Sequence, residues 1–276
     1  MGLCSNWLVR SLAALWYRLD KRHRRITLAN LKFAYGDTLN PEDRERLARE
    51  VFCHFVRFAW EMVELLLAPL SVIKRKVVIV GDEHMEAALA QGRGAIAIAA
   101  HAGNWEYTVM GYGLLCRPGV AVGRELDQPW AARMARYIRQ RGGNAMVAKQ
   151  KGMKGIMGYL RQNWPVGIVI DQNTTTAGGV LVNFFGKPAR TTPVAALLAR
   201  RGTPVLPTLS RRLPDGRHLM AIFPPLPLKK TSDAQADIQR HLELQNRVIE
   251  AWVRAEPAQW LWLHRRWKNQ FPEIYE

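Results

Sequence analysis

Short apolar runs alternate with segments of helical periodicity along most of this chain. The runs are rich in valine, isoleucine and alanine and end at glycine or polar residues, a pattern typical of buried strands. The expected strands are 77–80, 94–100, 120–122, 145–147, 166–170, 205–209 and 218–223. Because strands that alternate with helices build layered, mostly parallel sheets, the pattern predicts an α/β fold, with a mostly parallel central sheet flanked by helices.

The segments between the runs define the expected helices. Asn40 and Pro41 precede a long stretch with apolar residues at helical spacing, so we expect a helix from there to about Leu67, before Pro69. Further helices are expected at 82–91, 105–115, 129–141, 151–162, 192–201 and 233–255. Since the first 70 or so residues show only helical patterns, an N-terminal helical segment should precede a single layered domain.

The chain of 276 residues carries a net charge of +17, and its 48% hydrophobic content is that of a globular protein. So much positive charge implies an anionic partner: nucleic acid, an acidic membrane surface or an acidic protein. The basic residues are spread along the chain and no nucleic-acid-binding module is recognisable, which argues against nucleic acid. The cysteines Cys4, Cys53 and Cys116 lack metal-ligand spacing and are interpreted as free thiols in a reducing compartment.

Residues 1–21 contain the best candidate for membrane contact. The segment Trp7–Leu19 is too short to cross a bilayer, holds Arg10 and Arg18, and lacks the features of a cleaved signal. Its leucines and tryptophans fall mostly on one helical stripe, which fits a helix lying in a membrane interface. Two interpretations stay open: a membrane-associating helix over residues 1–21, or an ordinary helix packed on its own domain.

A histidine and a carboxylate five residues apart, His101 and Glu106, follow the apolar run 94–100. On one continuous helix their side chains would diverge by about 140°, so they meet only if His101 lies in a turn and Glu106 in the first helical turn. Gly103 permits a tight turn and Asn104 is a good N-cap, so the sequence allows this geometry. A nearby helix N-terminus favours the neutral imidazole that a general base needs. The alternative is a core histidine beside a glutamate that complements the helix dipole.

Other polar residues stand at the carboxyl ends of predicted strands, where parallel sheets place their working sites. Arg124 follows 120–122 and either holds an anionic group or is a solvated surface arginine. Asp171 and Gln172 follow 166–170, and Asp171 either binds a sugar hydroxyl, orders other site residues or caps the strand. Because the standard nucleotide, serine-nucleophile and zinc motifs are absent from the sequence, the chemistry indicated is a base that activates a substrate hydroxyl.

A series of motifs then points to one family. In chain order they are His23-Arg24-Arg25 with Asn30-Leu31, His101 with Glu106, Arg124 with Pro129, Asp171-Gln172, Phe184-Phe185-Gly186-Lys187-Pro188-Ala189 with Thr191-Thr192, and Glu256-Pro257 with Gln259-Trp260, Trp262 and His264-Arg265-Arg266-Trp267-Lys268. Together they resemble the lipid A biosynthesis late acyltransferases (lauroyl and myristoyl transferases) over residues 22 to 270. The resemblance implies a glycerolipid-acyltransferase-like domain over residues 22–276. Members usually carry an N-terminal membrane span, whereas this chain keeps at most an amphipathic helix there.

The resemblance implies transfer of a fatty acyl chain from an acyl carrier protein thioester to a hydroxyl of a lipid A precursor, with no metal or other cofactor. It implies that His101 is the general base and that Glu106 orients it, as a His/Glu dyad. The substrate contacts expected are Asn104, Arg124, Asp171, Gln172, Phe184, Phe185 and Arg190. For Asn104 capping is the stronger interpretation, and Phe184 and Phe185 line an acyl tunnel or else belong to the core.

The partners implied are acyl carrier protein, a lipid A precursor or other glycolipid, and an anionic membrane surface. We therefore expect a peripheral protein on the cytoplasmic face of the bacterial inner membrane. The block Trp260–Lys268 interleaves tryptophans with cations, which suits a lipid–water interface, unless the block packs on the core. The acceptor itself stays open, because a lysophospholipid, a phosphatidylinositol mannoside or another glycolipid would suit the same chemistry.

Overall fold

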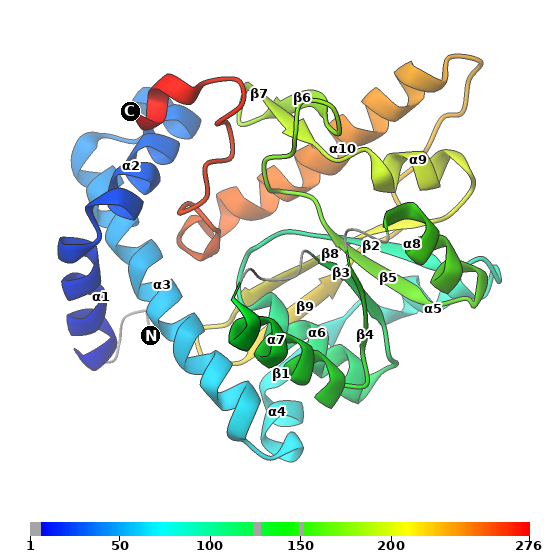
Figure 1. Cartoon of the computed structure of the whole chain (residues 1–276), viewed down its shortest axis with the longest axis horizontal. Coiled ribbons are helices and arrows are strands. Elements are labelled where there is room, and N and C mark those ends of the chain that lie inside the picture. Colours follow the sequence, from blue (N-terminus) through cyan, green and yellow to red (C-terminus); the bar gives the residue numbers. More distant parts are fainter. Residues whose placement is uncertain (1–6, 124–127, 149–151) are drawn as a thin grey trace.

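A mostly parallel sheet organises the fold, as predicted (Figure 1). The computed structural model describes residues 7–123, 128–148 and 152–276, and within these ranges seven strands form the sheet, in the order β1-β9-β8-β2-β5-β3-β4. Strands β8, β2, β5, β3 and β4 run parallel, and β9 runs antiparallel to β8. The strands are β1 Val77–Val80, β2 Ala95–Ala99, β3 Val120–Gly123, β4 Ala145–Ala148, β5 Pro165–Val169, β8 Val205–Arg212 and β9 His218–Ile222.

The helices agree with the expected ones to within a few residues. Asn40 caps the long helix α3 by accepting a hydrogen bond from the backbone N–H of Asp43, and Asp233 caps α10 in the same way. The helices are α1 Trp7–Leu19, α2 Lys21–Tyr35, α3 Pro41–Leu67, α4 Leu70–Lys76, α5 Asp82–Leu89, α6 Trp105–Leu115, α7 Pro129–Arg141, α8 Gly152–Arg161, α9 Val194–Arg200 and α10 Ala234–Ala255.

One hairpin was not expected from the sequence. Strands β6 (Val180–Phe184) and β7 (Lys187–Thr191) pair antiparallel beside α10 and are joined by Phe185 and Gly186. Both joining residues have positive φ, 55° and 72°, as a tight two-residue hairpin turn requires. Phenylalanine seldom adopts this conformation, so the Phe-Phe-Gly sequence gives no clear turn signal.

Helices cover both faces of the sheet, and the alternation of side chains along each strand decides which core a residue joins. On β2, Ile96 and Ile98 pack into the main core together with residues of α8, α9 and α10. Ala95 and Ala97 face the other way and contact a smaller core formed with α5 and α6. The buried sheet therefore holds its strand ends rigidly between two helical layers.

The N-terminal helices and the C-terminal segment lie together on one side of the molecule (Figure 1). Nδ2 of Asn30 on α2 donates to the carbonyl oxygens of Trp262 and His264, at 2.6 and 2.8 Å. Helix α1 packs on α3 through the buried side chains of Ala13 and Tyr17. In the described ranges, no helix is both long enough and apolar enough to span a bilayer.

The C-terminal tryptophan block belongs to the core and not to an exposed interface, which corrects one of the two interpretations above. Trp260, Trp262 and Trp267 are each at most 1% exposed, and the guanidinium of Arg266 is buried with them. Arg266 donates to the carbonyl oxygens of Gln172 and Arg190 and to the hydroxyl of Thr191. Because both terminal nitrogens of this guanidinium find acceptors inside the protein, the buried cation is held by the core and not by a lipid–water boundary.

Candidate active site

The candidate site lies at the carboxyl ends of β2 and β5, which are neighbours in the sheet. The strands run parallel with Ala99 opposite Val169, so the residues two positions later, His101 and Asp171, leave the sheet side by side. Nδ1 of His101 lies 2.7 Å from Oδ1 of Asp171, and the backbone N–H of His101 donates to Oδ2 at 2.7 Å. Strand pairing thus joins two residues that are 70 positions apart.

The C-terminal segment supplies a third member of this cluster. It runs beside the turn after β2, where Ala102 and Trp260 form an isolated bridge. The indole Nε1 of Trp260 donates to Oδ2 of Asp171 at 2.7 Å. Burial by itself raises the pKa of Asp171, but the ring of His101 and the hydrogen bonds outweigh it, and the pKa lies below its ordinary value. Asp171 is therefore an ionised carboxylate that only accepts.

This arrangement determines which ring nitrogen of His101 bonds to the carboxylate and which one faces away from it. Because the carboxylate only accepts hydrogen bonds, Nδ1 carries a proton, so in the neutral ring it is Nε2 that has the lone pair. Nε2 lies 3.5 Å from the side-chain amide nitrogen of Gln172. The side chain of His101 is 18% exposed, whereas that of Asp171 is only 1% exposed. The imidazole is thus partly accessible from outside while the carboxylate bonded to it is shielded from water.

The turn between β2 and α6 has the geometry that the sequence predicts. Gly103 has a φ of +61°, and an added Cβ would lie 2.7 Å from Cα of Arg211, so glycine is required there. Asn104 caps α6, since its Oδ1 accepts from the N–H of Tyr107 at 3.0 Å. Its Nδ2 donates to Glu61 at 2.9 Å, and the whole side chain is buried. The structure thus agrees with the capping interpretation of Asn104.

Beneath the turn lies a buried ionic network that our sequence analysis missed. Arg212 on β8 donates to both carboxylate oxygens of Glu61 on α3 at 2.5 Å, and to Nδ1 of His54 at 2.8 Å. Burial alone raises the pKa of Glu61, but Arg212 more than offsets it and the pKa lies below its ordinary value. Burial lowers the pKa of His54 well below its ordinary range. His54 and Glu61 lie two helical turns apart on α3, and that polar stripe in an apolar helix was the available signal.

Glu106 has a different partner from the one predicted. It lies in the first turn of α6, as expected, but Arg139 on α7 binds both of its carboxylate oxygens, one of them from Nε at 2.9 Å. Glu106 thus connects α6 to α7, because its side chain leaves the helix towards α7. The carboxylate that bonds to His101 is that of Asp171, which follows the neighbouring strand β5. The predicted hydrogen-bonded pairing of His101 with Glu106 is therefore replaced by the pairing with Asp171.

The structure places the other predicted residues in several surroundings. Nη1 of Arg190 donates to the carbonyl oxygens of Thr176 and Gly179, and so holds the segment that leads into β6. Phe184 and Phe185 are 1% and 3% exposed and pack in the main core with the C-terminal tryptophans. Their assignment to substrate contacts, like that of Gln172 and Arg190, stays a prediction. Arg124 lies outside the described residues.

His264 also lies near the pair and was quoted in the sequence only as part of a motif. Burial lowers its pKa to about 4, and the nearby Asp171 partly opposes this effect. The ring is therefore neutral at pH 7, and its Nε2 accepts a hydrogen bond from the N–H of Asn173 at 3.0 Å. His264 thus orders the segment that follows Asp171. Within the ranges described, no group of three or more His, Cys, Asp and Glu side chains is arranged to hold a metal ion.

Comparisons of the amino-acid sequence with known proteins identify a family. Residues 5–269 match the family model described as bacterial lipid A biosynthesis acyltransferase. The chain is 27% identical to the lipid A biosynthesis lauroyltransferase of Escherichia coli K12, over 94% of the chain and 83% of that protein. It is 26% identical to the palmitoleoyltransferase of the same strain, over 91% and 80%. It is also 30% identical to a phosphatidylinositol mannoside acyltransferase of Mycobacterium tuberculosis, over 71% of the chain and 61% of that protein.

Proposed function

The chain belongs to the bacterial lipid A biosynthesis acyltransferase family and is an acyltransferase, and from this premise we propose that it acylates a hydroxyl of a lipid A precursor, with His101 as the general base. The observation that carries the proposal is the bond between Nδ1 of His101 and the buried Asp171, which leaves Nε2 free at the carboxyl ends of parallel strands. This geometry supports a His101–Asp171 pair in place of the His/Glu dyad.

The reaction then needs no nucleophile from the protein. Nε2 of His101 removes the proton from the acceptor hydroxyl as its oxygen attacks the thioester carbonyl carbon, and a tetrahedral intermediate forms. The intermediate collapses to an ester and breaks the carbon–sulfur bond, and the leaving thiolate takes the proton back from His101. Asp171 holds the ring in the required tautomer and offsets the positive charge that the ring carries between the two steps. Glu106 acts only as a positioning residue, through Arg139 and the start of α6.

The proposed donor is a fatty acyl thioester on acyl carrier protein. Supporting this choice is the net charge of +17, because acyl carrier proteins are acidic as a class. We expect the rate at limiting donor to fall as salt rises from about 50 to 500 mM, since the Debye length shortens from about 14 Å to about 4 Å. A rate that salt leaves unchanged, or a strong preference for acyl-CoA, would contradict a carrier-protein donor.

The proposed acceptor is a lipid A precursor, as the names of the first two relatives suggest. The 30% identity to the mannoside acyltransferase supports a phosphatidylinositol mannoside or another glycolipid as the alternative acceptor. The test offers the purified protein one acyl carrier protein thioester and, in parallel, a lipid A precursor, a lysophospholipid and a mannoside. Mass spectrometry should find one added acyl chain on the lipid A precursor. Acylation of another lipid alone would contradict the proposed acceptor.

The proposed location is the cytoplasmic face of the inner membrane, with residues 1–21 as the contact. Supporting it, Trp7 and Leu19 of α1 are 75% and 70% exposed, with Leu8, Leu12 and Leu15 exposed between them. The exposed leucines fit the membrane-associating interpretation of this helix, while its opposite side packs on α3. A peripheral protein should leave washed membranes in high salt or carbonate. Release by detergent alone would contradict the proposal.

A further inference from the structure

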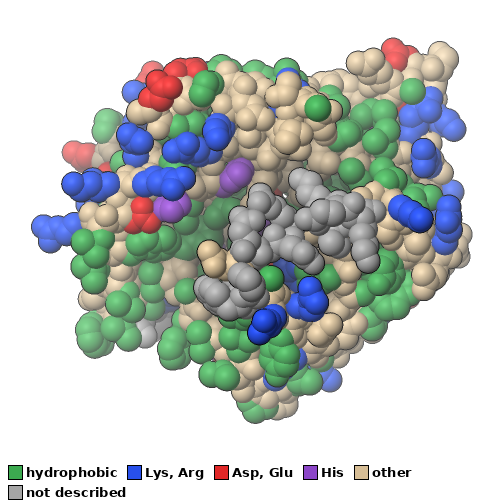
Figure 2. All heavy atoms as spheres, viewed as in Figure 1, with side chains coloured by type: hydrophobic (Ala, Val, Ile, Leu, Met, Phe, Trp, Pro, Cys, Tyr) green, Lys and Arg blue, Asp and Glu red, His purple; other side chains and the backbone are tan. Residues whose placement is uncertain are grey.

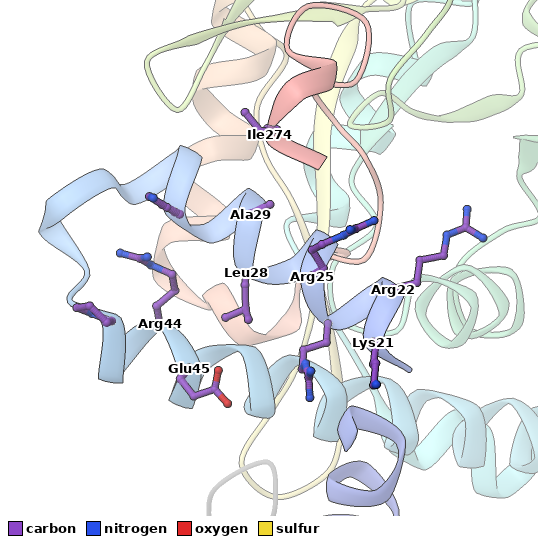
Figure 3. Close-up of a pocket in the computed structure, with 11 residues that line it drawn as sticks. Lys21, Arg22, Arg25, Leu28, Ala29, Arg44, Glu45 and Ile274 are labelled. Carbon is purple, nitrogen blue, oxygen red and sulfur yellow. The ribbon is translucent and has the colours of Figure 1, made fainter. Parts of the chain in front are cut away.

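A strongly basic hollow lies where α2 faces the start of α3 (Figure 3). It is a shallow, open hollow of about 860 Å³ with an apolar side formed by Leu28, Ala29 and Ile274. Its cationic side chains are Lys21, Arg22, Arg24, Arg25, Lys32 and Arg44. We call this hollow the α2 pocket. Apart from Arg44 on α3, these cations repeat along α2 at helical spacing, so they share one face of that helix while the opposite face is buried.

The positive charge of the α2 pocket is not balanced within the protein. Glu45 is the one carboxylate among the described residues that line it, and Glu45 already accepts from the hydroxyl of Tyr17 at 2.8 Å and from Arg49 at 2.7 Å. In the part of the chain that the structure describes, no carboxylate pairs with Lys21, Arg22, Arg25 or Lys32, and all four are exposed. The pocket therefore presents an open positive potential to an external anion.

The apolar face of α1 adjoins the α2 pocket. Leu19 ends α1 and is 70% exposed, and only Asp20 separates it from Lys21 at the start of α2. In Figure 2, hydrophobic side chains gather over α1 and Lys and Arg side chains gather over α2 directly beside it. Exposed leucines next to exposed cations match the layers of a bilayer surface, where acyl chains lie below and phosphates lie at the level of the cations.

We propose that the α2 pocket binds the phosphate head groups of anionic phospholipids in the bilayer on which the enzyme works. One arginine guanidinium group can bind two phosphate oxygens at once. The apolar side of the pocket accommodates the glycerol end of the lipid. A hollow of this size admits a phospholipid head group. The inference rests on the membrane contact proposed for α1, and it adds a saturable site that fixes the orientation of the enzyme on the membrane.

The test measures binding of the full chain to vesicles of phosphatidylcholine alone or with phosphatidylglycerol. One double variant is Arg22→Gln/Arg25→Gln. Its matched control, Lys229→Gln/Lys230→Gln, removes the same charge from exposed residues just before α10, at the far end of the molecule from α2 (Figure 1). Since each surface cation contributes about fivefold, the pocket variant should bind anionic vesicles roughly 25-fold more weakly, and the control should change by less than about twofold. Neutral vesicles should bind both variants equally.

Three results would overturn the proposal. The first is an equal loss in both double variants, which would mean that only net charge matters. The second is unchanged binding of the pocket variant to anionic vesicles. The third is normal vesicle binding by a pocket variant that loses affinity for an acidic carrier protein, which would assign the pocket to a protein partner. The thermal unfolding of both variants should match that of the wild type, because all four side chains are exposed.

A third variant, Leu12→Ser/Leu15→Ser, keeps this test separate from the contact of α1. It should weaken binding to neutral and anionic vesicles alike, because the removed leucines contribute an apolar and not an electrostatic term. If it binds normally, the contact of α1 fails, while the comparison of the pocket variant with its control still decides the phosphate site. Neither measurement involves acyl transfer, so neither depends on the proposed reaction.

Discussion

Two carboxylates lie on either side of the turn after β2, and they differ in what they hold. Asp171, at the end of β5, binds the ring of His101, its backbone N–H and the indole of Trp260. Glu106, in the first turn of α6, binds the guanidinium of Arg139. Glu106, five residues from His101 in the sequence, joins two helices. Asp171, 70 residues away, bonds to the imidazole and places a proton on its Nδ1. Sequence proximity therefore gives the wrong partner, and strand adjacency gives the right one.

The largest expected effect comes from His101 itself, through which either carboxylate would have to act. His101→Ala should lower the transfer rate by about 10²- to 10⁴-fold, because among the residues that the structure describes no other basic nitrogen stands in the same place. The rate is measured with thioester donor and lipid acceptor both saturating. Full activity in this variant would show that His101 is not the base, and Asp171 would then have no role in the reaction.

The next largest effect is expected from Asp171→Asn. The amide can donate to Nδ1, which favours the tautomer with the proton on Nε2, so kcat should fall by about 10²-fold with little change in KM. In the His101→Ala background the same substitution should have almost no further effect on the rate, since the two groups act as a unit. Additive losses of rate in the double variant would mean that Asp171 acts independently of His101.

A smaller effect on the rate, with a clear effect on stability, is expected from Glu106→Gln. It leaves the partly buried guanidinium of Arg139 without its carboxylate, which should cost about 3 kcal/mol of unfolding free energy. The rate measured below the unfolding transition should fall by less than about tenfold. Replacing both partners, as Glu106→Met with Arg139→Met, should recover much of the stability. A loss of rate as large as that of Asp171→Asn would mean that Glu106 takes part in catalysis with His101, as the sequence predicts.

The smallest effect on the transfer rate is expected from the buried histidine His218, which instead makes the stability of the fold depend on pH. Burial lowers the pKa of His218 to about 4, and the ring is 1% exposed. The unfolded chain binds this proton first, near pH 6.5, so the stabilisation is complete above that pH and is lost as the pH falls through about 4. The loss amounts to about 3 kcal/mol at most. Denaturant unfolding at pH 7 and pH 4.5 should show a shallower loss in His218→Gln than in the wild type. An identical loss in both would mean that His218 does not titrate as described.

Much of the fold could be predicted from local patterns, because strand and helix signals are local. The N-cap residues Asn40, Asn104 and Asp233 predict where their helices begin. The apolar runs before His101 and Asp171 both predict strands. The adjacency of β2 and β5 could not be predicted in the same way, because β3 and β4 lie between them in the sequence but not in this part of the sheet. Asp171 is therefore among the site residues predicted from the sequence, but its hydrogen bond to His101 is not.

The two tryptophan-containing ends of the chain show a second limit. Both mix tryptophans with cations, yet α1 exposes Trp7 and its leucines, while Trp260, Trp262 and Trp267 are buried. One difference is an acceptor that tertiary structure supplies: the indole of Trp260 donates to Asp171, 89 positions away, while Trp262 donates within its own segment to the carbonyl oxygen of Pro257 at 2.7 Å. Composition reveals the donors in a segment but not the acceptors that other segments bring to them.

The central claim is that Asp171, and not Glu106, holds the proton of His101 on Nδ1. The most direct measurement is a proton–nitrogen NMR spectrum of the imidazole groups, with the signal of His101 identified by its absence in His101→Ala. The wild type should show a protonated Nδ1 with a downfield proton and an unprotonated Nε2. That signal should disappear in Asp171→Asn and persist in Glu106→Gln. A signal that persists in Asp171→Asn and disappears in Glu106→Gln would contradict the account.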